Sequence, residues 1–529
     1  MNRPLLGILS VFLLTYLSAS AQVPSSPIDV QHYNFNIRLN DKDNIIKGRA
    51  DITLKFLRKA DSINIDLVKQ NNTGKGMIVS NVTEKGVQLK FQQYDDHITI
   101  KTPVHSAGRR TFTYIITYQG IPADGLIISR NKFGHRTFFG DNWPNRAHNW
   151  IPCVDNVADK ATVDFDIIAP DHYQVVSNGL KVSETPVAGG MKETRWRESA
   201  QLPTKVMVIG VADFAIDHTG NVDNIPVYTY VFPENKEAGF GSYSIAKEIL
   251  AYYIDKIGPF AYEKLANVQS KTIFGGMENA SCIFYFENSV GDKGIEELMA
   301  HEIAHQWFGD AASETSFAHL WLSEGFATYM TNVYLENKYG EDILKQRLTE
   351  DRKTVFAFEK EHFAPVVDTT VKGDFMQLLN ANSYQKGGWV LHMLRRKIGD
   401  EAFWQGIRSY YAKYNGGNAS TEDLQAEMQN AYGHPLERFF KQWLYTPGHL
   451  QLSVKWRFDP KEKVVDLEVG QIQNEPYEFR LELSINGEIH HVDIKDKFAT
   501  FQIPVTGEAT SVVLDPNVNL LAEFELVHG

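Results

Sequence analysis

Apolar and polar residues alternate along the first part of the chain. Tyr33, Phe35, Ile37 and Leu39 fall on one side of an extended segment, with polar residues between most of them. The same period of two returns at 50–56, 97–102, 111–118, 162–168 and 205–211. This period is typical of strands that have one face in a core and the other in water. Residues 22–215 are therefore predicted to form one antiparallel β domain, and the polar residues 218–224 indicate a loop that follows it.

The period changes in the middle of the chain. Apolar residues recur there every three to four positions, as in helices that bury one face, at 244–257, 295–308, 320–339, 384–398 and 421–431. Gly340 and Gly399 directly follow two of these segments, where a glycine commonly ends a helix. The pattern predicts a mainly helical domain over 216–447.

Alternation returns after Pro447 and Gly448, with Leu452, Val454 and Trp456 on one face. Asn486-Gly487, set between alternating segments, predicts a tight hairpin turn. About 80 residues of short strands are typical of a small β sandwich, here over 448–529. The predicted fold class is thus α+β and multidomain.

Composition limits the classes of function. The chain has 529 residues, with 53 Lys and Arg against 65 Asp and Glu, a formal net charge of −12. This charge argues against a nucleic-acid partner and against a polybasic membrane surface, because both need a clustered positive field. The two cysteines, Cys153 and Cys282, allow at most one disulfide. Each lies in an apolar context, which favours two buried thiols, although a pairing stays open.

The N-terminus has the features of an export signal. Arg3 precedes an apolar segment at 5–17, and Ala19-Ser20-Ala21 is a small-x-small cleavage site. A signal peptide is predicted over 1–21, with an uncleaved anchor helix as the alternative. No later stretch of 18 apolar residues exists. We expect export, to a periplasm or to the medium, without stable membrane insertion after cleavage.

The strongest chemical motif is His301-Glu302-Ile303-Ala304-His305, inside a predicted helix. Residues four apart share a helix face, so both imidazoles can bind one metal ion while Glu302 lies beside them. Glu324, in the next predicted helix, is a candidate third ligand, since catalytic zinc takes three protein ligands. Taken singly, the histidines could be ordinary core residues, and Glu324 could be an acid that the helix dipole favours in a first turn.

Two further segments flank this motif. Gly275-Gly276-Met277-Glu278-Asn279 lies upstream in an apolar context, where two glycines let a backbone approach a ligand closely. The alternative there is a bulged edge strand with an exposed Glu278. Downstream, Tyr384 is a protonated phenol at neutral pH and can donate a hydrogen bond to a developing oxyanion; alternatively, it is a packed aromatic at a helix start.

Together these segments resemble the aminopeptidase N family of zinc gluzincins, peptidase family M1. The resemblance rests on HEIAH at 301–305, Glu324, GGMEN at 275–279 and YQKG at 384–387. Further similar segments are PCVD at 152–155, GPFAYEKL at 258–265 and WFG at 307–309, and the similarity extends from about residue 30 to the end.

The resemblance implies a thermolysin-like catalytic domain that removes N-terminal residues from peptides with a free N-terminus. It implies one Zn²⁺ per chain, held by His301, His305 and Glu324. Glu302 is then the general base, and Tyr384 stabilises the oxyanion together with zinc. The implied substrate-binding residues are Gly275, Gly276, Met277, Glu278 and Asn279, with Glu278 on the α-ammonium group.

The sequence departs from the family pattern in three respects. Trp143 stands where the family usually has Gln or Glu near the substrate N-terminus, so it could narrow the pocket or simply pack against the catalytic domain. His148 replaces a usual Arg. The chain also resembles the short, three-domain members, from which we expect an open cleft that admits long peptides.

Other functions remain as alternatives. They are a zinc endopeptidase, an epoxide hydrolase on the same scaffold, and a non-catalytic binding module. The presence of all three ligands together with Glu302 and Tyr384 disfavours the last of these. The preferred N-terminal residue, the peptide length and the oligomeric state are not predicted.

Overall fold

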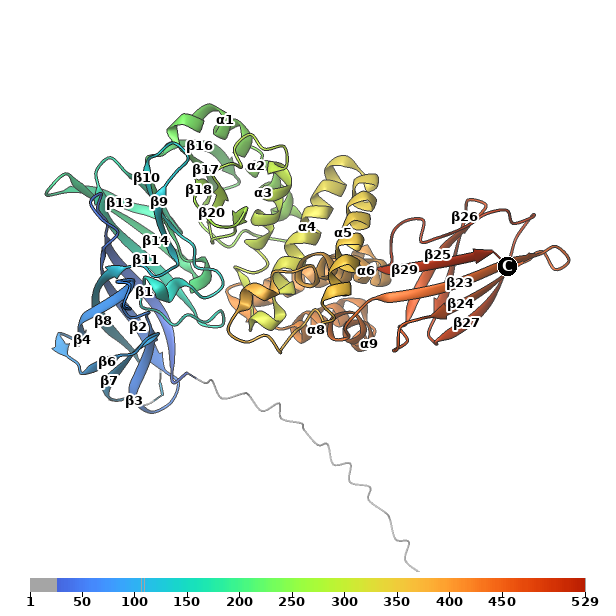
Figure 1. Cartoon of the computed structure of the whole chain (residues 1–529), viewed down its shortest axis with the longest axis horizontal. Coiled ribbons are helices and arrows are strands. Elements are labelled where there is room, and N and C mark those ends of the chain that lie inside the picture. The colour runs from blue at the N-terminus through green and yellow to red at the C-terminus, as the bar shows by residue number, and fades with distance from the viewer. Residues whose placement is uncertain (1–25, 106, 109, 529) are drawn as a thin grey trace, which may run out of the picture.

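The computed structural model of the protein describes residues 26–105, 107–108 and 110–528. Three regions follow one another along its long axis: N-terminal strands, a mainly helical middle and C-terminal strands (Figure 1). The predicted α+β multidomain fold is confirmed. The predicted signal peptide, 1–21, lies outside the described residues, so export and localisation stay predictions. Within the described part of the chain, no helix has the length and apolar character needed to cross a membrane.

The N-terminal region is built from strands. They are β1 (Ile28–Arg38), β2 (Ile46–Phe56), β3 (Ala60–Asp66), β4 (Gly76–Glu84), β5 (Val87–Gln88), β6 (Phe91–Gln93), β7 (His97–His105), β8 (Thr111–Ile121), β9 (Leu126–Arg130), β10 (Arg136–Gly140), β11 (Lys160–Pro170), β12 (Gln174–Ser177), β13 (Leu180–Val187), β14 (Met191–Pro203) and β15 (Ile209–Ala212). Tyr33, Phe35 and Ile37 of β1 are fully buried, as the period of two predicts.

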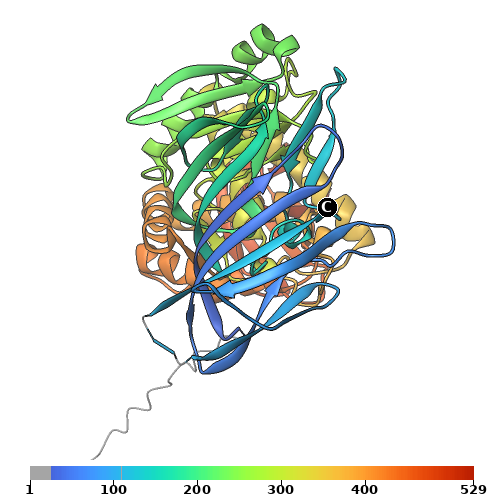
Figure 2. The same ribbon diagram turned by 90° about the vertical axis from the view of Figure 1, so that its left-hand side faces the viewer.

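These strands form a sheet of eight, in the order β13-β14-β11-β1-β2-β8-β4-β5, with two smaller sheets, β12-β15-β10-β9 and β3-β7-β6. In the large sheet β1 and β11 run parallel and the other pairs are antiparallel. The predicted antiparallel domain therefore contains one parallel pair. Figure 2 shows its strands in front of the helices.

The middle region combines helices with a sheet. Its helices are α1 (Lys236–Tyr243), α2 (Ala246–Lys256), α3 (Ile295–His305), α4 (Trp321–Tyr339), α5 (Glu341–Glu361), α6 (Gly387–Ile398), α7 (Asp400–Tyr414), α8 (Thr421–Tyr432) and α9 (Glu437–Phe440). Its strands are β16 (Ala215–Val222), β17 (Ile225–Val231), β18 (Leu265–Ser270), β19 (Gly276–Met277), β20 (Cys282–Phe286), β21 (Ala312–Glu314) and β22 (Gly417–Ala419).

Five of these strands form a sheet in the order β16-β17-β18-β20-β19, with β19 at one edge. The prediction of a loop over 218–224 is wrong, because these residues complete β16 and form its turn into β17. Their outward-facing polar side chains gave them the composition of a loop. α4 lies at the centre of the helices and packs against α3, α5 and α6. Gly340 and Gly399 end α4 and α6 with φ of +96° and +84°.

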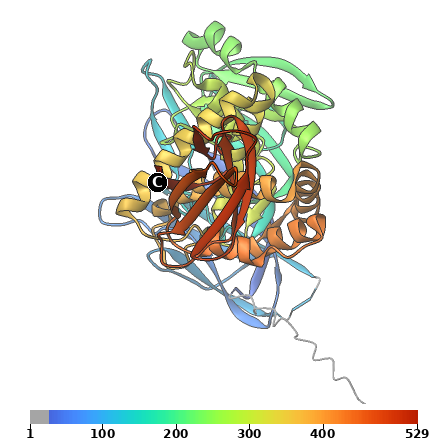
Figure 3. The ribbon, with the colours of Figure 1, turned by 90° about the vertical axis from the view of Figure 1, so that its right-hand side faces the viewer.

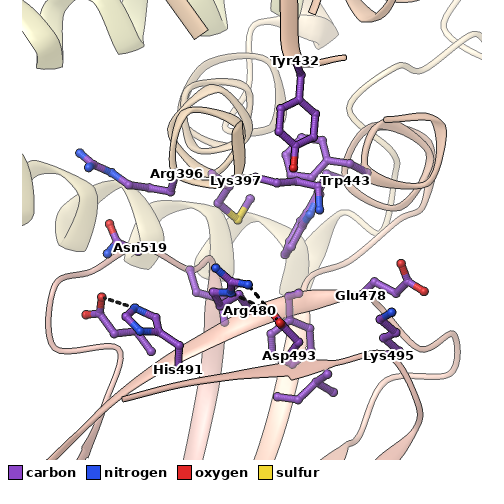
Figure 4. Close-up of a pocket in the computed structure, with 16 residues that line it drawn as sticks. Arg396, Lys397, Tyr432, Trp443, Glu478, Arg480, His491, Asp493, Lys495 and Asn519 are labelled. Atoms are coloured by element: carbon purple, nitrogen blue, oxygen red, sulfur yellow. Dashed lines mark hydrogen bonds and ion pairs between the residues drawn. The ribbon is translucent and has the colours of Figure 1, made fainter. Parts of the chain in front are cut away.

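The C-terminal region contains β23 (Leu450–Asp459), β24 (Val464–Gln471), β25 (Phe479–Ile485), β26 (Glu488–Ile494), β27 (Phe498–Pro504), β28 (Val512–Leu514) and β29 (Ala522–His528). They form a four-stranded sheet, β27-β24-β23-β29, and a three-stranded sheet, β26-β25-β28 (Figure 3). Asn486 and Gly487 form the turn between β25 and β26 with φ of +49° and +91°, as predicted. A cavity of about 490 Å³ lies between this region and the helices α6 and α8 (Figure 4).

The two cysteines lie in different regions of the fold. Cys153 faces Asp66 of β3 through a short backbone bridge, and Cys282 begins β20 in the middle region. Both are buried and free. The prediction of two buried thiols is confirmed.

Candidate metal centre and substrate pocket

Two histidines and one glutamate converge between α3 and α4. His301 and His305 lie one turn apart on α3, and Glu324 lies in the first turn of α4. The two Nε2 atoms are 3.1 Å apart. Glu324 Oε2 lies 3.4 Å from the Nε2 atom of His301 and 3.2 Å from that of His305. The structure thus brings together the three residues that were predicted as ligands.

The size of this triangle fits a zinc ion. Ligand atoms at 2.0–2.1 Å from a tetrahedral metal lie about 3.3 Å from one another, and the three observed separations are 3.1, 3.2 and 3.4 Å. Two imidazole nitrogens and one carboxylate oxygen are also a usual donor set of catalytic zinc. His301, His305 and Glu324 can therefore hold one Zn²⁺.

The second nitrogen of His305 has its own partners. Nδ1 lies 3.2 Å from the carbonyl oxygen of Phe308 and 3.1 Å from Oγ of Ser323. Such contacts orient a ligating imidazole and leave Nε2 for the metal. Gly309 makes room for them: its φ is +119°, and a Cβ there would lie 2.2 Å from Oγ of Ser323.

The pKa values of the two glutamates move in opposite directions. Burial alone would raise the pKa of Glu324, but the charges and hydrogen bonds of His305 and His301 outweigh burial and lower it. Burial raises the pKa of Glu302 well above that of an ordinary glutamate; His305 opposes this shift, and the carboxylates of Glu278 and Glu324 add to it. An ionised ligand therefore lies beside a carboxyl group with high proton affinity.

The edge strand β19 passes directly over Glu302. A Cβ added to Gly276 would lie 2.2 Å from Oε1 of Glu302, whereas a Cβ on Gly275 would meet nothing within 4 Å. Met277 pairs with Phe284 of β20, so the next residue, Glu278, leaves the strand beside α3. The absence of a side chain at Gly276 thus lets the strand approach the carboxylate.

Glu278 is buried, with 5% of its surface exposed. The predicted alternative of an exposed Glu278 on an edge strand is therefore wrong, although β19 is indeed an edge strand. Among the described residues, Oε1 of Glu278 has no hydrogen-bond partner, and neither amide atom of the buried Asn279 has one. Buried polar atoms are normally paired, so the carboxylate of Glu278 is available to a cationic ligand.

Tyr384 lines the same cavity as β19. It belongs to a five-residue π-helical turn, Asn382–Lys386, which leads into α6. Its ring is nearly parallel to that of His301, with centroids 5.9 Å apart. Burial, together with the carboxylates of Glu324, Glu278 and Glu302, raises the pKa of the phenol well above its usual value. The hydroxyl group therefore keeps its proton and can donate it in a hydrogen bond.

All these groups line one cavity of about 280 Å³. Its polar lining consists of His301, His305, Glu324, Glu302, Glu278 and Tyr384. Its other lining residues are Trp143, Phe274, Gly275, Gly276, Met277, Leu298 and Leu379. Every predicted site residue except Asn279 is part of this lining.

Trp143 both faces the pocket and packs against the middle region, the two positions considered from the sequence. It lines the cavity, and its ring packs edge to face on Phe274 at 6.1 Å and on Phe317 at 5.8 Å. His148 is not among the cavity residues: its Nδ1 lies 2.6 Å from Oδ2 of Asp155 within the N-terminal region. The Arg-to-His departure from the family pattern therefore lies outside the pocket.

Sequence reasoning missed two residues that support the pocket. The side chain of Gln306 donates to the carbonyl oxygen of Glu278 at 2.6 Å and accepts from the backbone N–H of Ser281 at 2.7 Å. Lys205 of the N-terminal region forms a fully buried ion pair with Glu314 at 2.8 Å. Burial lowers the pKa of Lys205, but the charges of Glu314 and of the pocket residue Glu278 outweigh burial and raise it. The position of Gln306 next to His305 is too weak a sequence signal to predict a role in the pocket. Lys205 lies in a segment predicted as an alternating strand, where a lysine is expected to face solvent.

The helix that carries Glu324 follows the HExxH helix beside the edge strand β19, which is the arrangement expected from the resemblance to gluzincins. A model of the peptidase M1 N-terminal domain matches residues 29–206, and a model of the peptidase family M1 domain matches residues 242–443. The chain belongs to peptidase family M1.

Known relatives are similar over much of the chain. "Probable aminopeptidase 2" of Sulfurisphaera tokodaii is 26% identical over 482 residues, which make up 87% of this chain and 59% of that protein. "Leucyl aminopeptidase" of Saccharolobus solfataricus is 25% identical over 78% of this chain and 54% of its own length. "Aminopeptidase M1" of Arabidopsis thaliana is 28% identical over 59% of this chain and 37% of its own length. The chain thus spans about half the length of these relatives.

Proposed function

We propose that the protein is a zinc-dependent aminopeptidase that removes N-terminal residues from peptides. One observation carries this proposal: the buried carboxylate of Glu278, whose Oε1 atom has no hydrogen-bond partner among the described residues, lines the same cavity as the three convergent ligand atoms. A carboxylate in that position binds the free α-ammonium group of a peptide and so places the first peptide bond at the metal centre. The names of the relatives support the same activity.

Each step of the proposed hydrolysis is assigned to residues of this cavity. Zinc, when bound by His301, His305 and Glu324, supplies Lewis acidity that polarises the scissile carbonyl group and makes water a better acid. Glu302 accepts the proton of the attacking water on its carboxylate and then delivers it to the leaving amine. The high pKa that burial gives to Glu302 favours the acceptance of this proton.

Tyr384 and Glu278 complete the reaction site. The phenol of Tyr384 donates a hydrogen bond to the oxyanion as charge develops on the carbonyl oxygen. Glu278 provides specificity, because an acetylated N-terminus has no positive charge and would leave the buried carboxylate unpaired. The protein should therefore prefer peptides with a free N-terminus.

The test compares fluorogenic peptides with free and with N-acetylated termini, using wild-type, Glu302→Gln and Glu297→Gln proteins, all loaded with zinc. Only the free series should be cleaved, and Glu302→Gln should lower kcat by about 10²–10⁴-fold because the general base is lost. Glu297 is the matched control, since it lies on the same helix at the surface, paired with Arg347. Its substitution should leave kcat unchanged.

Two results would contradict the proposal. Equal cleavage of both peptide series would mean that Glu278 does not anchor the amine and that the protein is an endopeptidase, consistent with Trp143 in place of a second polar anchor. Cleavage of neither series by the zinc-loaded wild type would exclude peptide hydrolysis and redirect the search to epoxides.

A further inference from the structure

A buried lysine ends the turn that carries Tyr384. Lys386 is the last residue of this turn, and its side chain is fully buried. Its Nζ atom donates to Oε1 of Glu359 at 2.6 Å and to the carbonyl oxygen of Gly448 at 2.7 Å. Glu359 belongs to α5, and Gly448 lies just before β23. One ammonium group therefore ties the tyrosine turn to two separate segments.

The carboxylate of Glu359 has a second side-chain partner. Its Oε2 atom bonds to Nδ1 of His449, whose side chain is 8% exposed. The imidazole stacks on Phe356 of α5 with centroids 4.1 Å apart, and its Nε2 lies 3.4 Å from Oε2 of Glu523 in β29. His449 thus belongs to the start of the C-terminal β domain. We call Lys386, Glu359 and His449 the anchor cluster.

The end of the turn also packs closely against α4. A Cβ added to Gly325 would lie 2.8 Å from the Cα atom of Gly387, and one added to Gly387 would lie 3.0 Å from the Cα atom of Gly325. Gly325 directly follows the ligand Glu324, and Gly387 directly follows Lys386. Two backbones are therefore in contact directly after the turn. The turn is thus held by this backbone contact as well as by the anchor cluster.

We propose that Lys386 is a positioning residue for Tyr384, and that Glu359 and His449 support it, so that the C-terminal β domain helps to place the phenol opposite His301. This inference rests on the proposed role of Tyr384 in the peptidase reaction. The argument is geometric: Lys386 does not line the catalytic cavity, yet it fixes the backbone only two residues from Tyr384. A misplaced donor loses much of its effect on a transition state, because displacements of about 1 Å can cost about 10²-fold in rate.

The kinetic test uses Lys386→Met and Glu359→Gln in the full chain, each with and without Tyr384→Phe. Alone, each variant should lower kcat about tenfold to hundredfold, with KM and zinc content unchanged. In the Tyr384→Phe background the same substitutions should change kcat less than about threefold, because the donor they position is already absent. His449→Gln provides a third variant should Lys386→Met fail to fold.

The matched control is Arg352→Met. Arg352 also lies on α5 and also reaches the C-terminal domain, where its guanidinium is 3.5 Å from the buried Asp515. Its ring contacts, with Trp389 of α6 and Phe524, lie outside the turn Asn382–Lys386. It should leave kcat within about threefold of the wild type. An equal fall of kcat in Arg352→Met, or an undiminished effect of Lys386→Met in the Tyr384→Phe background, would overturn the proposal.

A second readout does not depend on hydrolysis. Amide hydrogen exchange in peptides that cover 380–388 should become faster in Lys386→Met and in Glu359→Gln, and should stay unchanged in Arg352→Met. Unchanged exchange in the first two variants would show that the anchor cluster does not hold the turn. If the wild type cleaves no peptide, the proposed function fails, while the exchange experiment still decides whether Lys386 positions Tyr384.

Discussion

The metal-ligand cluster and the tyrosine turn face the same cavity, but different kinds of contact hold them. His301, His305 and Glu324 come from two successive helices, and their supports, Ser323 and the carbonyl of Phe308, are their sequence neighbours. The tyrosine turn, by contrast, is linked through Lys386 to Glu359 of α5, which in turn bonds to His449 at the start of the C-terminal region. The contacts of the predicted ligands are thus local in sequence, whereas the contacts proposed to position Tyr384 join distant segments.

The largest effect is expected from Glu324→Gln, which removes an anionic ligand and leaves the tyrosine turn intact. Zinc affinity should fall by at least about 10³-fold, since each ligand contributes a share of a binding free energy on the order of 10 kcal/mol. Zinc content after dialysis against a metal buffer measures this loss. Glu361→Gln, an exposed change at the end of α5, is the control. Full retention of zinc would show that Glu324 is not a ligand.

A smaller effect is expected from Gly276→Ala, which acts on the general base alone. The new methyl group would overlap the carboxylate of Glu302 and displace it, so kcat should fall about 10²-fold while zinc content is kept. Gly275→Ala is a closely matched control, because the same methyl group there meets nothing within 4 Å. Equal activities of the two variants would mean that β19 does not constrain Glu302.

The smallest effect is expected from Ser323→Ala, which removes one of the two partners of Nδ1 in His305. Zinc affinity should fall about tenfold, at the lower end of what the loss of such an orienting contact costs. Competition with a fluorescent chelator measures it, and Ser316→Ala, an exposed change just before α4, serves as the control. An unaltered affinity would indicate that the carbonyl of Phe308 alone orients His305, which would make the ligand cluster still more local.

The same contrast explains which parts of the site the sequence predicts. The ligands are separated by one helical turn and by one helix-to-helix connection, so helical periodicity is enough to bring them together. Gly276 and Glu278 stand out in the sequence through the two glycines in an apolar context, but only the family resemblance implies that they bind substrate. The division of the chain into three regions also follows from periodicity, because the spacing of the apolar residues changes from one region to the next.

What the sequence does not predict depends on long-range contacts. α5 is missed because only a narrow face of it is buried, with Leu344, Leu348 and Val355 as its buried apolar residues, which is a weak helical signal. Lys386 and Glu359 read as surface charges, and only the folded chain shows that they are buried and paired. No periodic pattern encodes the approach of His449 to Glu359 across 90 positions of sequence.

The order of strands in the C-terminal sheet bears on how the chain can fold while it is being translated. β23, which directly follows His449, pairs in parallel with β29, and the rest of that domain lies between them in sequence. During translation one edge of β23 therefore stays open until residues 522–528 have emerged. The helices that carry His301, His305 and Glu324 are synthesised before Gly448 and His449, so the residues of the ligand cluster leave the ribosome before the last residues that contact the tyrosine turn and its partner Glu359.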